Sequence, residues 1–203
     1  MSSTELPDAP SCGRNREPIL QQLTRLLASS RKVLEVGSGT GQHAVYFAPQ
    51  LPHLEWQTSE RSQQLEAVKS WLAEIPNSNL PQPLALDVGD SWPEISADAI
   101  FTANTLHIMS AELVQKFFLH SADVLEPEGL LIVYGPVKIA GEFIGPTNAD
   151  FDIQLKEHDP KRGIRDLEWL DQLAESAGFS RAELNYLPAN NQLMVWRKSD
   201  NKE

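Results

Sequence analysis

The sequence predicts an α/β fold built on a doubly wound, mostly parallel seven-stranded sheet whose last strand is antiparallel. Short apolar runs alternate with segments of helical periodicity through most of the 203 residues, as in successive βαβ units. A glycine-rich turn follows the first apolar run, which is typical of the entrance to such a sheet. Two strand-like runs separated only by a turn close the chain, and they predict an antiparallel pair.

The expected elements follow one another in a regular order. Seven strands are expected at 33–36, 54–58, 84–86, 99–103, 130–134, 182–187 and 193–197. Helices are expected from Pro18 to Leu27 and over 40–50, 65–75, 113–125 and 167–177. Between the fifth strand and the last helix, residues 136–165 show little regular pattern beyond a short helix near 151–157. Loops of this length in a compact domain are usually functional or disordered.

Composition limits the class of protein and its partners. The hydrophobic content of 41% is that of a soluble globular protein, and no apolar run approaches the ~20 residues of a membrane span. The start lacks a secretory leader and Cys12 is the single cysteine, so we expect a cytoplasmic protein without disulfides. The net charge of −11 argues against bulk nucleic acid and favours a small molecule, or a peptide or protein segment.

The spacing of the glycines limits the class of ligand that the turn could bind. Gly37, Gly39 and Gly41 occupy alternate positions directly after the strand at 33–36. A dinucleotide-binding fingerprint would need its third glycine at position 42, which is Gln42, and no phosphate-cradling G-x-x-x-x-G-K-[ST] run occurs. Three alternating glycines weaken a chain, so we expect that they serve a ligand that approaches the bare backbone.

The run Glu35-x-Gly37-x-Gly39-x-Gly41 resembles the first motif of class I S-adenosylmethionine-dependent methyltransferases. This resemblance covers roughly residues 17–198 and implies their Rossmann-like fold, with S-adenosylmethionine as the cofactor. The cofactor has no phosphate but carries an ammonium and a sulfonium, so an acid beside the turn is electrostatically reasonable. Glu60 follows the turn by about 20 residues, where a carboxylate can accept both ribose hydroxyls.

The resemblance extends to the later strands. Asp87 stands where an acid of these methyltransferases bonds the adenine amino group, and the backbone amide of Val88 stands where the next amide meets the ring. Asn104 begins a segment that resembles the fourth motif, beneath the transferable methyl. The expected cofactor-binding residues are therefore Arg16, Glu35, Gly37, Ser38, Gly39, Gly41, Glu60, Asp87, Val88 and Asn104. No metal is expected.

The fourth motif also limits the chemistry. It is neither N-P-P-Y nor D-P-P-Y, the forms used for exocyclic amino groups of bases or glutamine side chains, and the chain has no Pro-Cys nucleophile. His107 has a near-neutral reference pKa and is the first candidate for a general base, with Tyr134 second. The alternative is that His107 only lines the cofactor pocket or bonds backbone.

Two segments are candidates for covering the ligands. Residues 1–16 are expected to form a mobile tail or flap before a single domain at 17–198, and 199–203 a frayed tail. The group at 14–16 is either a solvated helix start or a lid whose arginines face a carboxylate. Residues 136–165 are expected to form the acceptor lid. The polar candidates around it are Tyr134, Lys138, Asn148, Asp152, His158 and Arg165.

Three patches, at 14–19, 45–48 and 163–167, are also similar to a small family known only as methyltransferase-like, which has no settled substrate. The expected function is therefore methyl transfer to a small-molecule acceptor that the sequence does not identify. One alternative is a catalytically silent S-adenosylmethionine-binding domain that acts through a protein partner. The other is a nicotinamide-dependent oxidoreductase, which Gln42 and the closing strand pair disfavour. The oligomeric state is not indicated.

Overall fold

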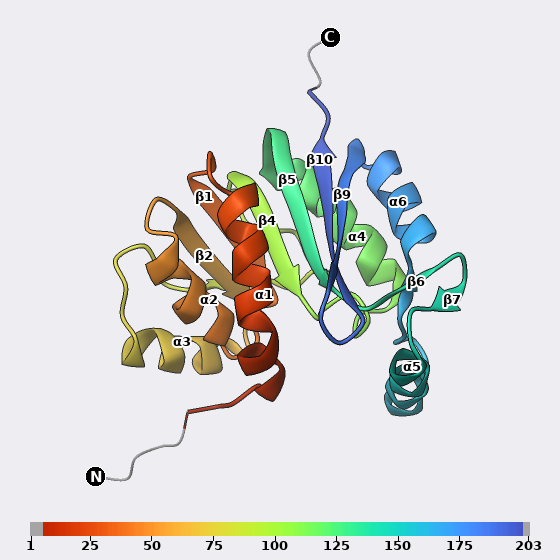
Figure 1. The fold of residues 1–203 in the computed structure, drawn as a ribbon. Coiled ribbons are helices and arrows are strands. Elements are labelled where there is room, and N and C mark those ends of the chain that lie inside the picture. The colour runs from red at the N-terminus through yellow and green to blue at the C-terminus, as the bar shows by residue number, and fades with distance from the viewer. Residues whose placement is uncertain (1–5, 201–203) are drawn as a thin grey trace. The chain divides into compact units, whose positions relative to one another are not determined.

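The computed structural model describes residues 6–200, and the chain divides into two compact units, Met1–Asp87 and Val88–Glu203. The seven strands of the main sheet are distributed over the units, three in the first and four in the second (Figure 1). The expected mixed α/β fold, mostly parallel with an antiparallel last strand, is confirmed. Three additional short strands form a second, small sheet.

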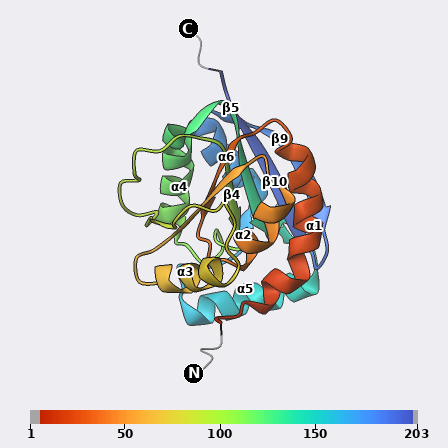
Figure 2. The ribbon, with the colours of Figure 1, turned by 90° about the vertical axis from the view of Figure 1, so that its left-hand side faces the viewer.

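The first unit is a parallel three-stranded layer in the order β3-β2-β1. Its elements are α1 (Pro10–Leu26), β1 (Lys32–Val36), α2 (Gln42–Phe47), the 3-10 helix η1 (Ala48–Gln50), β2 (Glu55–Glu60), α3 (Leu65–Glu74) and β3 (Leu84–Ala85). Figures 1 and 2 show α1 along one face of this layer. Apolar side chains of α1 are wholly buried, including Ile19 and Leu23, which stabilises the helix against the strands.

Helix α1 begins eight residues earlier than expected. It starts at Pro10 and contains Pro18, so residues 10–16 are helical rather than part of a tail. The apolar periodicity begins only at Ile19, because the preceding turns are held by polar contacts instead. Asn15 is buried there and its Oδ1 lies 2.7 Å from Nε2 of His43. Hydrophobic periodicity does not detect such contacts.

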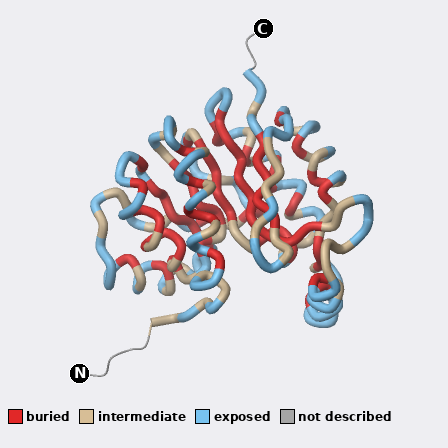
Figure 3. Tube along the Cα trace, viewed as in Figure 1, coloured by how far each residue is buried: buried red, intermediate tan, exposed pale blue. Residues whose placement is uncertain are grey.

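The second unit contains a four-stranded layer in the order β4-β5-β10-β9. Its elements are β4 (Ala97–Ala103), α4 (Ala111–Val124), β5 (Leu125–Gly135), α6 (Leu167–Ser176), β9 (Phe179–Leu187) and β10 (Asn191–Lys198). Strand β10 is antiparallel to both of its neighbours, β5 and β9, whereas β4 and β5 are parallel. The T-shaped contacts of Phe118 with Phe117 and Trp196 lie in the core between α4 and β10. Figure 3 shows β5 and β10 as largely buried.

The segment 136–165 is regular, contrary to the expectation of a mostly irregular loop. It contains β6 (Val137–Ile139), β7 (Glu142–Phe143) and α5 (Pro146–His158), and β8 (Arg165–Asp166) ends it. Strands of two or three residues are too short to show an alternating pattern. In α5 the buried residues are Asn148, Asp152 and Leu155, two of them polar, so the helix presents no apolar stripe.

Within residues 6–200, no helix combines the length and the apolar character that crossing a membrane requires.

Candidate functional site

The glycine turn joins β1 to α2 in the first unit. Gly37, Gly39 and Gly41 all have positive φ, of 71°, 61° and 87°. A Cβ on Gly41 would lie 3.3 Å from Val68, so this glycine is required by packing as well as by its backbone. A Cβ on Gly39 would have no neighbour within 4 Å. The turn is therefore open beside Gly39, where a ligand can approach the backbone.

The carboxylate of Glu60 is fixed on this turn. Its Oε2 accepts a hydrogen bond from the amide of Gly39 at 2.8 Å, and its Oε1 accepts one from the amide of Arg61 at 2.9 Å. Glu60 is the last residue of β2 and only 6% exposed. Oε2 has a lone pair beyond this bond and can accept a hydroxyl donor at the turn, whereas Oε1 also lies 3.0 Å from the side-chain amide nitrogen of Gln64.

Glu35 is buried behind the turn. Its Oε2 accepts hydrogen bonds from the indole Nε1 of Trp56 and from the Ser38 hydroxyl, each at 3.0 Å. Burial raises the pKa of Glu35 to about 7, against which these two hydrogen bonds act, and the nearby charge of Glu60 raises it further. A cation near this carboxylate would favour its ionised form.

Ser38 connects the turn to β2. Its hydroxyl donates to Glu35 and accepts from the amide of Ser59 at 3.2 Å, and its own amide donates to the Ser59 carbonyl at 2.9 Å. These contacts show how the Ser38 side chain holds the turn. Whether Ser38 also binds a cofactor stays a prediction.

The N-terminal end of α1 contacts the turn. Gln42 accepts from the amide of Ala9 at 2.7 Å and from the Thr40 hydroxyl at 2.9 Å, and donates to Asp8 at 2.9 Å. The residue that breaks the dinucleotide fingerprint thus fastens the incoming chain to the glycine turn. A glycine at position 42 would remove all three side-chain contacts.

The arginine group at 14–16 has separate contacts. The guanidinium of the exposed Arg16 lies over the ring of Tyr46, 4.3 Å from its centroid. Asn15 instead points inward to His43, whose ring stacks on Phe47 at 5.3 Å. Burial lowers the pKa of His43 to about 4, and the charge of Arg16 acts in the same direction. Cofactor contact by Arg16 stays a prediction.

Two predicted site residues mark the end of the first unit and the start of the second. Asp87 follows β3 by two residues and is half-buried, and Val88 is buried. The amide of the preceding Leu86 donates to the Glu60 carbonyl at 3.0 Å. The proposed contacts of Asp87 and Val88 with adenine stay predictions.

In the second unit, the turn after β4 contains Asn104 and His107. Asn104 has a left-handed backbone with φ of 60°, a conformation that asparagine tolerates better than most residues, and its amide donates to the Tyr134 carbonyl at 2.8 Å. Tyr134 is buried within β5, between Ala103 of β4 and Leu193 of β10.

His107 is 6% exposed and its ring meets Phe151 of α5 edge-on, with centroids 5.2 Å apart. Burial lowers the pKa of His107 to about 4, and the positive charges of Arg165 and Arg162 lower it further. The imidazole is therefore neutral at physiological pH. It can accept a proton, but weakly, because a general base works best with a pKa near the working pH.

Sequence patterns missed several of the residues that build these sites. Trp56 is one, although a buried indole N–H needs an acceptor. It lies two residues before Thr58, the partner of Glu35 in the parallel β1–β2 pairing, so both side chains are on the same face of the sheet. The contacts of Gln42 with Asp8 and Ala9, and of Asn15 with His43, leave no comparable pattern, because these partners are far apart in the sequence.

Comparison with solved structures finds methyltransferases. An O-methyltransferase family protein from Burkholderia thailandensis matches with a TM-score of 0.82 at 15% identity, over 95% of this chain and 59% of that chain. Human N-acetylserotonin methyltransferase in complex with S-adenosylmethionine matches with a TM-score of 0.78 at 17% identity, over 93% and 53%. The S-adenosylmethionine-dependent methyltransferase SibL gives 0.79 at 22%, over 93% and 56%.

These likenesses confirm the class I methyltransferase fold. The chain spans less than two thirds of the length of each of these structures. A family model matches residues 7–198, which is nearly the whole chain, and its description is "Protein of unknown function (DUF938)". The chain therefore belongs to this family of unknown function, and it has the fold of class I methyltransferases.

Proposed function

We propose that this protein is an S-adenosylmethionine-dependent methyltransferase that acts on a small-molecule acceptor. The observation that carries the proposal is the Glu60 carboxylate held 2.8 Å from the Gly39 amide, beside a turn that is open at Gly39. An acceptor-only group at this place suits the paired hydroxyls of an adenosyl ribose, and no lysine or arginine is needed for a cofactor without phosphates. The structures that share the fold are of methyltransferases.

The charge beside the turn supports the proposed cofactor. S-adenosylmethionine supplies an electrophilic methyl when it is bound, and the chain supplies orientation and electrostatics. We assign Glu35 to the cationic part of the cofactor, since its buried carboxyl has a pKa of about 7 and gains from a nearby positive charge. The other proposed contacts are those of Arg16, Gly37, Ser38, Gly39, Gly41, Asp87, Val88 and Asn104.

We propose His107 as the group that accepts a proton from an oxygen or nitrogen acceptor, with Tyr134 second. The neutral imidazole of His107 is in the correct form for this role at pH 7, although its pKa of about 4 makes it a weak base. A thiolate acceptor would need no base at all. Transfer then depends mainly on the alignment of acceptor, methyl and sulfur.

The same low pKa favours a second candidate function, that of a catalytically silent S-adenosylmethionine-binding domain that acts through a protein partner. Methyl transfer to a metabolite extract, followed by mass spectrometry, separates the two. A methylated product that requires the protein supports the enzyme, whereas cofactor binding without any product supports the silent domain.

Cofactor binding is tested by calorimetry with S-adenosylhomocysteine on the wild type and on Glu60→Ala. We expect the substitution to weaken binding about tenfold or more, because charged hydrogen bonds are lost. The matched control is Glu55→Ala, at the other end of β2, where Glu55 is exposed and paired with Lys32 at 3.2 Å. Equal affinity of Glu60→Ala and wild type would make Glu60 a purely structural acid. No binding by the wild type, or preference for a nicotinamide dinucleotide, would overturn the proposed function.

A further inference from the structure

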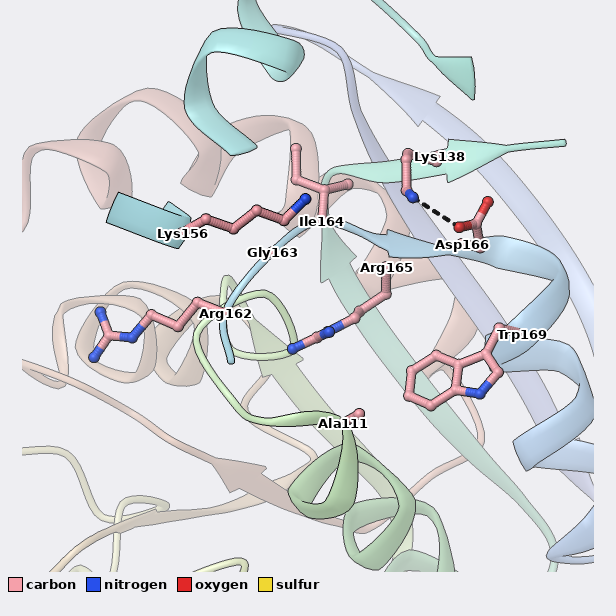
Figure 4. A pocket seen from close by; sticks show the side chains of 9 residues that line it. All are labelled: Ala111, Lys138, Lys156, Arg162, Gly163, Ile164, Arg165, Asp166 and Trp169. Atoms are coloured by element: carbon pink, nitrogen blue, oxygen red, sulfur yellow. Dashed lines mark ion pairs between the residues drawn. The ribbon is translucent and has the colours of Figure 1, made fainter. Parts of the chain in front are cut away.

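A basic pocket of about 260 Å³ lies in the second unit (Figure 4). Its wall consists of the segment 162–166, the start of α4 at Ala111, Trp169 of α6, Lys138 of β6 and Lys156 of α5. Four of its nine lining residues are lysine or arginine and one is acidic, in a chain with a net charge of −11. The lysine and arginine side chains thus make this pocket locally basic in an acidic protein. The segment overlaps the 163–167 patch, which the general methyltransferase motifs do not explain.

Two of the four cations are neutralised within the protein. Lys138 pairs with Asp166 at 2.8 Å, and Asp166 also accepts from the amide of Gly141 at 3.0 Å. Lys156 pairs with the buried Asp152 at 2.5 Å, whose other oxygen accepts from the amide of Ile164 at 2.7 Å. Both carboxylates thus have both oxygens occupied, which limits their repulsion of an incoming anion.

The guanidinium of Arg165 has no carboxylate within ion-pair distance among the residues that the structure describes. Its Nε donates to the Leu106 carbonyl at 3.3 Å, and its Nη2 donates to the carbonyls of Met109 and Lys161. These bonds fix the plane of the group and leave the two donors of Nη1 without an acceptor in the described part of the chain. Partial burial lowers the pKa of Arg165, and the negative charge of Asp152 acts in the opposite direction.

The rest of the pocket suits a small anionic molecule. In Figure 4, Arg165 and Trp169 extend on either side of the space above Ala111, while Arg162 points away from them. The Nε of Arg162 is 3.9 Å from Asp159 and makes no hydrogen bond. A guanidinium held in place at the wall of a pocket suits a carboxylate or a phosphate, and the indole offers an apolar wall.

We propose that this pocket binds a carboxylate or phosphate group of the methyl acceptor, with Arg165 as its principal ligand. The identification of the bound molecule as the acceptor rests on the proposed function. The pocket adjoins His107, because the amide of Gly163 donates to the His107 carbonyl at 3.0 Å and Arg165 holds the neighbouring Leu106. An anionic group held here would therefore lie in the same part of the molecule as the candidate base.

The test is a titration of the ¹⁵N-labelled full-length protein with inorganic phosphate and, separately, with benzoate, at low chloride. We expect at least one anion to shift the amide signals of 163–166 and the indole signal of Trp169, and Arg165→Gln to weaken its binding about tenfold or more. The two probes distinguish a phosphate site from a carboxylate site. No shift at these positions from either anion would overturn the proposal.

Because Arg165 also holds three carbonyls, a second pair of variants leaves it in place. Ala111 is exposed and is the first residue of α4, where an acidic side chain is compatible with the helix. Ala111→Glu should weaken anion binding by repulsion at least as strongly as Arg165→Gln, whereas its neutral match Ala111→Gln should bind like the wild type. Equal anion binding by the Glu and Gln variants would contradict the site.

Titration with S-adenosylhomocysteine is run in parallel, and it reports on the proposed function alone. A protein that binds the anion at 163–169 but not S-adenosylhomocysteine would overturn the methyltransferase assignment, and with it the acceptor, while the oxyanion site would stand. A protein that binds S-adenosylhomocysteine but neither anion would overturn the anion site and leave the proposed function in place.

Discussion

If the proposed cofactor binds beside Glu35, its binding should displace a proton from this buried carboxyl. With a pKa of about 7, a fraction of the Glu35 carboxyls carry a proton at neutral pH. A cationic ligand near Glu35 favours the ionised form, so binding of S-adenosylmethionine at pH 7 should release protons, less than one per protein. Calorimetry in buffers of different ionisation enthalpy measures this release.

Two controls isolate the contribution of Glu35. Glu35→Gln should bind without the buffer dependence, and S-adenosylhomocysteine, which lacks the sulfonium charge, should release less than S-adenosylmethionine. A release that persists in Glu35→Gln would assign the proton to another group.

For single residues, the sequence predicts the position in the fold better than it predicts the neighbouring side chains and the hydrogen bonds. The spacing from the glycine turn correctly brings Glu60 to the turn, because a βαβ unit has a nearly constant length. The hydrogen bond between Glu35 and Trp56 was not predicted, since it depends on how two strands are paired. The position of Arg165 beside a pocket depends in turn on the folding of the whole segment 136–165.

Within the glycine turn, two different constraints favour glycine: a positive φ and close packing. Gly41→Ala should lower the free energy of unfolding more than Gly39→Ala. Both residues have positive φ, which costs about 1–2 kcal/mol for alanine, but only at position 41 does the new methyl also approach Val68. Urea unfolding of the two variants measures the difference.

Calorimetry on the same variants should reverse the order, because the face of Gly39 is open. For each kcal/mol of unfolding free energy that is lost, Gly39→Ala should weaken the binding of S-adenosylhomocysteine by the folded protein more than Gly41→Ala does. If Gly39→Ala bound as tightly as the wild type, the open face of the turn would not be a ligand site.

Elements with an apolar pattern were predictable and those held by polar contacts were not. All seven strands of the main sheet were expected close to where they lie. Five of them are largely buried, whereas β3 and β9 are mostly half-buried or exposed. The first turns of α1 depend on Asn15, and α5 buries Asn148 and Asp152, so neither has the periodicity that marks a helix.

For the molecule as a whole, two buried histidines predict a loss of stability in acid. His43 and His107 each have a pKa of about 4 in the folded protein, against an ordinary value of 6.5. Between these values the unfolded chain binds more protons, so stability rises with pH and is lost as pH falls from 6.5 toward 4. Glu35 acts in the opposite direction between pH 4.5 and 7, because its pKa is raised and the folded protein holds its proton.

The contribution of one histidine can be measured as a difference of slopes. His43→Gln keeps a side-chain donor for Asn15 but removes the titration. The dependence of unfolding free energy on pH between 4.5 and 6 should then become shallower, by at most about 1.4 kcal/mol per pH unit. Urea unfolding at several pH values gives the slopes, and equal slopes for variant and wild type would show that His43 is protonated in the folded state.

The position of β10 has a consequence for synthesis. Strand β10 lies between β5 and β9, so β5 has no partner on that side until β10 has been made. Pairing so distant in sequence is slow to form, and an open strand edge can pair with other chains in the meantime. The second unit therefore completes its fold only once β10 has been made. A chain that ended at Leu187 would keep the edge of β5 exposed to aggregation.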